Sequence, residues 1–507
     1  MLYFWLVVPL ALIRLHPVYF VWYPKRMKTD TPERAQTAKK RLKRIVSTPS
    51  LVGGGVKTTA RLRLAQLHLL AREYEPAAEQ YRLILDMLMK DRRIKAAGWN
   101  LEANVHSQFA DCLEGLDDHY GAQIERERAA QCLTSKDADA PSLLASGKLL
   151  AQTGHYADAC ENYARALHLI SKHDIDLRAK ALVQLALASQ GAGRSDQMVQ
   201  AAEEAVACGP KPAMRILAHS MAGIGYGMDG NIAASERHLT IALDLATASN
   251  NKQQVAQALS QLANIERKRG NLQEAIDLAR KAGAMTAGSK RQSDMVEAEC
   301  HRRRGDYPAA RASMRAVQQG KPYSTPSAER RSQGISLIGC GWIEIEAGEP
   351  QAALDYLQQA AALFPQDVKL SVWCQSSIVG ALAMLGRYEP MQQTIQWVEA
   401  KLPEFANDRE TQMRVATMYA RVAFVQADYA RSRMHWHACL ALIPDPVEQP
   451  KIWYNIGECH FQQQDWSRAQ EAFDRSVNFG FDTHYVRKSQ QRLAEMQQMQ
   501  QMQQSAL

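Results

Sequence analysis

LLASGKLLAQTGHYADACENYARAL, residues 143–167, is the stretch that decides the fold of this chain. It predicts two short helices joined by a turn at Gly154, with the small residue Gly147 where the helices cross. In the second helix Ala159, Tyr163 and Ala166 recur at i, i+4 and i+7, which is the spacing of an apolar stripe. A hairpin of this size cannot bury both of its faces alone, so it needs copies of itself on either side.

The chain supplies these copies. Glycines at the expected turns recur every 35 to 43 residues, at Gly154, Gly193, Gly230, Gly270, Gly305, Gly348 and Gly386. A last copy, residues 453–477, has Gln464 where the others have glycine. The sustained alternation that predicts strands is nearly absent, so the sequence predicts an all-α fold.

This pattern resembles the tetratricopeptide repeat, which pairs helices through a small residue in the first helix, a turn glycine, and Ala and aromatic residues in the second. The resemblance covers about residues 59–480. It implies a right-handed α-α superhelix, a solenoid of about eleven helix pairs. It also implies that the first helix of each pair lines a concave groove.

Four segments are expected along the chain. Residues 1–24 form a hydrophobic anchor helix, 25–58 a basic juxtamembrane segment and linker, 59–482 the solenoid, and 483–507 a cap helix with a Gln/Met-rich tail. Solenoids need such a cap with a polar outer side. We expect Val486, Leu493 and Met496 to face the last hairpin.

The N-terminal stretch predicts an association with a membrane. Residues 2–23 are apolar over about the thickness of a bilayer, with interruptions at Arg14 and His16. A spanning helix is the favoured interpretation, and an interfacial helix or a buried cap on the first hairpin are the alternatives. Positive charge next to a span stays on the cytoplasmic side, so we expect a single-pass anchor with cytoplasmic repeats. That charge comes from Lys25, Arg26, Lys28, Lys39, Lys40, Arg41, Lys43 and Arg44, which could instead form a solvated basic helix.

The charge of the rest of the chain does not indicate nucleic-acid binding. The net charge is +8, but residues 1–63 carry 13 Lys and Arg against two acidic residues, so the remainder is close to neutral. Nine cysteines without paired spacing predict free, mostly packed thiols in a reducing compartment.

The sequence contains no convincing reaction centre. The glycine-rich stretches at 53–57 and 223–230 mimic nucleotide-binding loops, but no predicted strand precedes either one. His435 and His437 lie two residues apart and would point to different faces of a helix. We therefore expect no enzyme activity, no metal, no cofactor and no small-molecule substrate.

One basic region suggests a binding surface. The resemblance places Asn264, Arg267 and Lys268 on the groove face of one first helix, and Arg302 and Arg303 on that of the next. In peptide-clamping members of the family, such residues grip a peptide's main chain and carboxylates, and arginine matches carboxylates with two parallel hydrogen bonds. The alternative is a solvated charged face whose partners are acidic neighbours such as Glu266 and Glu299.

These observations favour a membrane-tethered scaffold or adaptor that binds a protein or peptide partner, acidic or extended, in its groove. One alternative is a soluble regulator that senses a peptide or associates with itself. Another is an assembly factor of the cell envelope. None of the three requires a nucleic acid.

Overall fold

The structure, a computed structural model, describes residues 32–47, 54–90, 99–134, 138–320, 326–363, 367–406, 408–443 and 445–505. These residues form helices joined by short turns and contain no β-strand, so the all-α prediction is confirmed for them. The chain divides into two compact units, residues 1–169 and 170–507. Each unit is described by itself.

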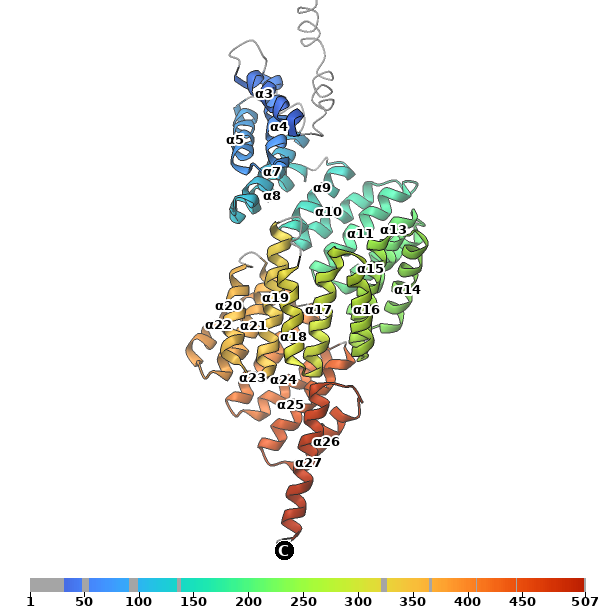
Figure 1. The fold of residues 1–507 in the computed structure, drawn as a ribbon, viewed down its shortest axis with the longest axis vertical. Helices are drawn as coiled ribbons and strands as arrows, with labels where there is room; N and C mark the ends of the chain where they lie inside the picture. Colours follow the sequence, from blue (N-terminus) through green and yellow to red (C-terminus); the bar gives the residue numbers. More distant parts are fainter. Residues whose placement is uncertain are drawn as a thin grey trace, which may run out of the picture. The chain divides into compact units, whose positions relative to one another are not determined.

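Unit 1 consists, in its described part, of one helix followed by three hairpins (Figure 1). The single helix is α3 (Pro32–Ser47), which packs on α4. The hairpins are α4 (Gly54–Leu70) with α5 (Tyr74–Lys90), α7 (Trp99–Gly115) with α8 (His119–Leu133), and α9 (Ala140–Gln152) with α10 (Tyr156–Leu169). Because α4 begins at Gly54, part of the glycine-rich stretch that we expected to be a linker is helical.

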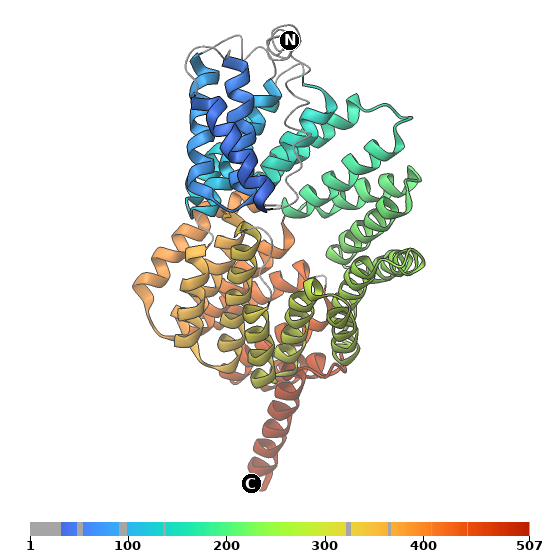
Figure 2. The ribbon, with the colours of Figure 1, turned by 45° about the horizontal axis from the view of Figure 1, so that its top comes forward.

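Unit 2 contains eight hairpins and a closing helix, and successive hairpins lie side by side (Figures 1 and 2). They are α11 (Ile175–Gly191) with α12 (Ser195–Ala207), α13 (Pro212–Met228) with α14 (Ile232–Ala248), α15 (Lys252–Arg269) with α16 (Leu272–Met285), α17 (Ala287–Arg304) with α18 (Tyr307–Gln319), α19 (Pro326–Ala347) with α20 (Pro350–Leu363), α21 (Val368–Met384) with α22 (Tyr388–Lys401), α23 (Arg409–Val425) with α24 (Tyr429–Leu442), and α25 (Gln449–Gln462) with α26 (Trp466–Val477). The short 3-10 helices η1 (Leu402–Phe405) and η2 (Pro446–Glu448) precede α23 and α25, and α27 (His484–Ser505) follows α26. The described hairpins of the two units number eleven, as the repeats predicted, while the handedness of a superhelix stays a prediction.

Each hairpin is held by a close crossing of its two helices. Four crossings share one arrangement, in which a glycine in the first helix faces a large side chain 16 positions later: Gly147 with Tyr163, Gly223 with Leu239, Gly341 with Leu357, and Gly457 with Phe473. A Cβ atom added to any of these glycines would come within 2.5–2.8 Å of the facing side chain. The small residue predicted at the crossing is therefore required by the contact between the two helices.

In many of the turns between the two helices of a hairpin, one residue adopts the left-handed backbone conformation, with positive φ. The seven turn glycines identified from the sequence have φ between 67° and 96°. At four equivalent turns a residue with a side chain adopts φ of 58–61°, namely Arg72, Asp117, Ala427 and Gln464. The packing of the hairpin thus imposes this conformation even where the residue disfavours it, as at Gln464, which replaces the turn glycine of the other copies.

The localisation expected from the sequence is contradicted. Residues 2–23, on which the anchor was predicted, lie outside the described residues, as do Lys25, Arg26 and Lys28. Among the helices that the structure does describe, none is both long enough and apolar enough to cross a membrane. The physical reason is that their apolar residues form stripes against neighbouring helices: even α19, with 22 residues, carries Arg331 and Glu346. The expectation of a single-pass membrane protein with cytoplasmic repeats is therefore wrong.

The remaining part of the basic tract belongs to α3. Ala38 and Leu42 face α4 and are buried together with Ala60, Leu64 and Leu67 of that helix. Lys39 is half-buried and pairs with Glu73 (Nζ–Oε2 2.7 Å). The side chains of Lys40, Arg41, Lys43 and Arg44 are exposed. In this part of the tract, α3 is an amphipathic helix whose charges lie away from its packed face.

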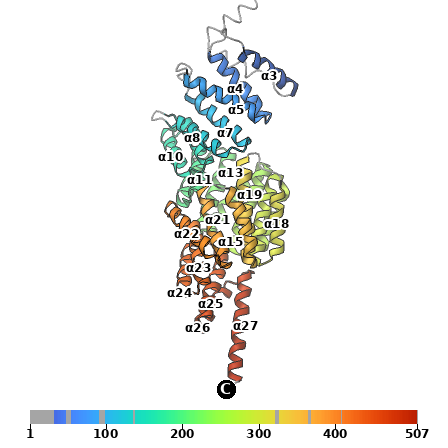
Figure 3. The same cartoon turned by 90° about the vertical axis from the view of Figure 1, so that its left-hand side faces the viewer.

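At the other end of the chain, α27 closes unit 2. Val486 and Met496 are buried and Leu493 is half-buried, and the last two pack with Phe473 of α26. The helix continues to Ser505, so the Gln/Met-rich tail is helical up to that residue, and the second half of α27 extends beyond the hairpins (Figure 3). All nine cysteines are free, and seven of them are buried, as predicted.

The crossing can be tested with Gly457→Ala. The added methyl group would overlap the ring of Phe473, so we expect the free energy of unfolding to fall by about 1–3 kcal/mol. Gly288→Ala is the control, because an added Cβ there meets no atom within 4 Å. Urea unfolding followed by circular dichroism measures both, and equal stabilities of the two variants would contradict the role of the crossing.

The turn can be tested with Ala427→Gly. A residue with a side chain pays roughly 1–2 kcal/mol for the left-handed conformation, and glycine does not. Ordering the more flexible glycine on folding costs roughly 0.5–1 kcal/mol, which is less. We therefore expect a higher thermal midpoint. Ala430→Gly, three residues later and exposed inside α24, should change the midpoint in the opposite direction because glycine disfavours helix.

Candidate functional site

The five residues predicted to bind a partner lie in unit 2, near the C-terminal ends of two adjacent first helices. Asn264, Arg267 and Lys268 belong to α15, and Arg302 and Arg303 belong to α17. Both helices end at a left-handed glycine, Gly270 and Gly305 respectively. The helices α15 and α17 pack against each other, so the sequence-based placement of the residues on neighbouring helices agrees with the structure.

All five residues make hydrogen bonds within the chain, and three of them, Lys268, Arg302 and Arg303, hold carboxylates. Lys268 pairs with Asp445 (Nζ–Oδ1 2.9 Å) and donates to the main-chain oxygen of Gly227. Arg302 pairs with Glu346 of α19 (Nη1–Oε1 2.5 Å) and with Glu299 one turn before it (Nη2–Oε1 2.7 Å). Arg303 pairs with Glu299 and with Glu448 of η2. The side-chain amide of Asn264 donates a hydrogen bond to the main-chain oxygen of Ser260, one turn earlier in α15.

The residues joined in this way form one charge cluster. We define the charge cluster as Lys268, Glu299, Arg302, Arg303, Glu346, Asp445, Glu448 and Lys451. Lys451 of α25 enters it through Glu346 (Nζ–Oε1 2.7 Å). The side chains of Glu346, Arg302 and Arg303 are 3%, 7% and 8% exposed, so these charges interact in a largely dry environment.

Apolar contacts hold the same segments together. Val447 of η2 is buried against α15, α16 and α17, in a cluster that includes Ala263, Ile276 and Cys300. Phe481 lies over Gly270, where a Cβ atom would come within 2.4 Å of its ring. His484 lies over Gly305 in the same manner. The turn glycines at the ends of α15 and α17 therefore serve a second purpose, since they let the C-terminal part of unit 2 approach closely.

The electrostatics follow from this arrangement. Burial alone raises the pKa of Glu346, but Arg302 and Lys451 outweigh it and lower the pKa to about 2. Burial likewise opposes ionisation of Glu299 and Glu448, and the neighbouring arginines again hold the pKa of both carboxyls below the ordinary value. The pKa of Arg302 is raised well above its usual range by Glu299 and Glu346, against the effect of burial. These directions favour the charged forms of Glu299, Glu346, Glu448 and Arg302 at neutral pH.

Arg267 differs from the other cations. Its Nε atom lies 3.4 Å from Oδ1 of Asn264, and within the described residues no carboxylate is within ion-pair distance of it. Burial and the neighbouring Arg303 lower the pKa of its guanidinium. Arg267 is therefore a half-buried positive charge without a directly paired anion.

The rest of the basic region joins neighbouring elements. Arg291 makes two hydrogen bonds to Glu329 of α19 (2.6 and 3.0 Å), and Arg311 makes two to Glu344 (2.8 and 2.5 Å). Arg304 pairs with Asp482 (Nε–Oδ2 3.0 Å). Glu299 was weighed from the sequence as a local partner, and it does pair with two of the arginines. The more distant carboxylates at 346, 445 and 448 were missed, because no sequence spacing relates them to α17.

No protein-family model matches this chain, and no curated protein sequence matches it. Among solved structures, it is similar to a Rap protein complexed with Competence and Sporulation Factor, with a TM-score of 0.49 and 12% identity over 70% of this chain and 99% of that one. It is also similar to an IFIT1 monomeric mutant with Gppp-AAAA, with a TM-score of 0.37 and 12% identity over 88% of this chain and 95% of that one. At these values neither likeness identifies a family or a function for this chain.

The charge cluster can be tested with Glu346→Gln. Loss of the carboxylate leaves Arg302 and Lys451 without their shared partner, so we expect the free energy of unfolding at pH 7 to fall by about 3–5 kcal/mol. The folded pKa of Glu346 is about 2 and its ordinary value is 4.5. The stabilisation is therefore complete above pH 4.5 and is lost as the pH falls toward 2.

The difference between wild type and Glu346→Gln should accordingly shrink as the pH falls below 4.5. Urea unfolding at stepped pH, down to the lowest pH at which the wild type stays folded, measures it. Glu389→Gln, at an exposed position in α22, is the matched control and should change stability by less than about 0.5 kcal/mol. Equal effects of the two substitutions would mean that the cluster does not stabilise unit 2.

Proposed function

We propose that this chain is a non-enzymatic helical-repeat protein that binds a protein or peptide partner through the partner's carboxylates. The observation that carries the proposal is Arg267, a half-buried cation for which the described residues provide no carboxylate within ion-pair distance. It lies beside the charge cluster, in which each cation holds a carboxylate. Glu299 and Asp445 act on this charge only from a distance, and burial still opposes it. A directly bound carboxylate from a partner would relieve this cost.

The surroundings of Arg267 support an extended acidic segment as the partner. The adjacent cations Lys268 and Arg303 already hold Asp445 and Glu448, two carboxylates three residues apart in the short segment around η2. This intrachain contact is an example of how α15 and α17 engage an acidic segment with a buried valine between its charges. A partner segment would add one further carboxylate at Arg267, in the bidentate manner that arginine favours.

Among the functions weighed from the sequence, this proposal corresponds to the peptide-sensing regulator more than to the membrane-tethered scaffold. Because Asp445 and Glu448 are joined to the rest of unit 2 by exchangeable ion pairs, a partner's carboxylates compete with them for the same cations. Binding would then be coupled to the contact between η2 and α17. The absence of enzyme activity, of a cofactor and of a nucleic-acid partner stays a prediction.

The test is a comparison of Arg267→Glu with Arg315→Glu. Both reverse one arginine charge, but Arg315 is exposed on α18, outside the charge cluster. A fluorescent library of extended peptides, in which each Glu-containing peptide has a Gln counterpart, is the probe, and fluorescence anisotropy is the measurement. We expect wild type and Arg315→Glu to prefer the Glu peptides, and Arg267→Glu to bind them about tenfold more weakly or worse.

Arg302→Glu and Arg303→Glu are unsuitable for this comparison, because these residues hold the charge cluster together and their loss would disturb unit 2 itself. The thermal midpoint of Arg267→Glu is measured as well, to check that this substitution does not destabilise unit 2. Equal affinity of all three proteins for Glu and Gln peptides would contradict the proposal.

A further inference from the structure

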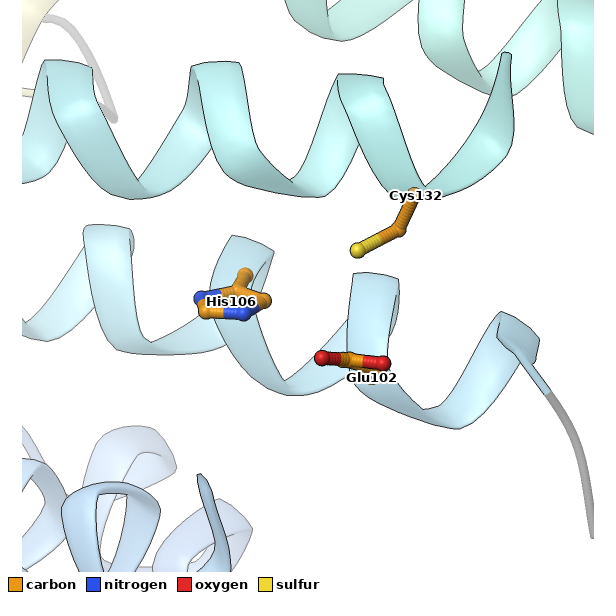
Figure 4. A group of neighbouring side chains, drawn as sticks. All are labelled: Glu102, His106 and Cys132. Carbon is orange, nitrogen blue, oxygen red and sulfur yellow. The ribbon is translucent and has the colours of Figure 1, made fainter. Parts of the chain in front are cut away.

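The hairpin of α7 and α8 in unit 1 brings together three side chains of types that bind metals. Glu102 and His106 lie on α7, and Cys132 lies on α8. One donor atom of each, a carboxylate oxygen, a ring nitrogen and the thiol sulfur, lies within 4.8 Å of the other two. Figure 4 shows Cys132 extending from α8 toward α7, which carries Glu102 and His106.

The placement follows from helical geometry. Glu102 and His106 are four residues apart, so they share the face of α7 that is turned toward α8. On α8, Cys132 is seven residues after Glu125, so these two share a face as well. The neighbours are small apolar residues, including Ala103 and Ala129, which keep the two helices close. The donors are therefore held by packed helices, which fix ligand positions better than loops do.

A second feature points to a metal rather than to an incidental cluster. Nδ1 of His106 lies 2.5 Å from Oε2 of Glu125, a buried carboxylate on α8. A carboxylate that accepts the Nδ1 proton fixes the imidazole in the tautomer whose Nε2 carries a free lone pair. Histidines that bind metals are commonly oriented by such a carboxylate, which also makes the ring a stronger ligand.

We propose that α7 and α8 of this chain form a Zn²⁺ site with Glu102, His106 and Cys132 as its three protein ligands and Glu125 as the carboxylate that orients His106. Sulfur, imidazole nitrogen and carboxylate oxygen are the three donors that zinc takes in proteins. Around a tetrahedral zinc ion such donors are roughly 3.5 Å apart, which small side-chain rotations reach from the present positions. Three protein ligands leave the fourth position to water.

Access and burial are consistent with this assignment. His106 is 9% exposed, whereas Glu102 and Cys132 are half-buried and border on solvent. An ion can therefore enter from the side of Glu102 and Cys132 while His106 stays fixed. The bound ion joins α7 to α8, so it should stabilise unit 1 by an amount that grows with the logarithm of the free Zn²⁺ concentration above the dissociation constant.

The sequence carried a weak signal for this site. Glu-x-x-x-His on one predicted helix is a pair of potential ligands on a single face, but the third ligand lies 26 residues later on the next helix. The expectation of no metal came from a search for local motifs and from His435 and His437, which instead contact the aromatic rings of Tyr419 and Trp453.

The experiment uses the full chain after treatment with a chelator, with ZnCl₂ alone as the titrant and a chromophoric chelator as competitor. We expect one Zn²⁺ ion per chain. Cys132→Ser and Glu102→Gln should each weaken binding by more than tenfold, and Glu125→Gln by 10- to 100-fold. Cys208→Ser is the matched control, since Cys208 is also a partly exposed thiol, and it should bind as the wild type does.

Substitution with Co²⁺ gives a readout that depends on the ligands and not on stability. Wild type and Cys208→Ser should show the absorption of a thiolate bound to cobalt, and Cys132→Ser should lack it while its circular dichroism stays helical. The proposal is overturned if the wild type binds no zinc in competition with the chelator, or if Cys132→Ser retains the affinity and the absorption band of the wild type.

Discussion

The close crossing of two helices within a hairpin is the contact on which the rest of the structure depends. A glycine in the first helix lets a tyrosine, leucine or phenylalanine of the second come within contact of the backbone, as for Gly147 with Tyr163 and Gly457 with Phe473. Because the two helices are so close, little apolar surface is left inside the hairpin, and the remainder must be buried against the next one. Stacking therefore follows from the crossing.

Unit 2 adds a constraint that simple stacking does not contain. In a solenoid each repeat contacts only its neighbours, but here α15 and α17 also contact η2. Arg304 at the end of α17 also contacts Arg487 of α27. Ion pairs make several of these connections, and in each of them a Lys or Arg side chain is paired with a carboxylate. The exception is Arg267, for which the described part of unit 2 provides no directly paired anion. Structural closure and a capacity to bind carboxylates are thus properties of one set of residues.

Sequence reasoning found the parts of this protein that are set by local spacing. The hairpins, their turn glycines, the apolar stripes and the cap residues of α27 all follow from periodicities of 3.6 residues within one helix or from the recurrence of the turn. The partners of Arg302 and Arg303 could not be found in this way, because Glu346 and Glu448 are related to them only by the path of the folded chain. The same applies to Cys132, whose approach to His106 depends on how α8 lies on α7. The membrane expectation rested on residues 2–23, which lie outside the described part of the chain, and the described helices provide no span in their place.

The pairing of Arg303 with Glu448 has a consequence for the growing polypeptide. The two residues are 145 positions apart, and at synthesis rates of 5–20 residues per second roughly 7–30 seconds separate their appearance. Throughout that interval α15 and α17 present several arginine and lysine side chains whose acidic counterparts have not yet been made. A nascent chain of this protein therefore passes through a cationic stage that the finished molecule no longer displays.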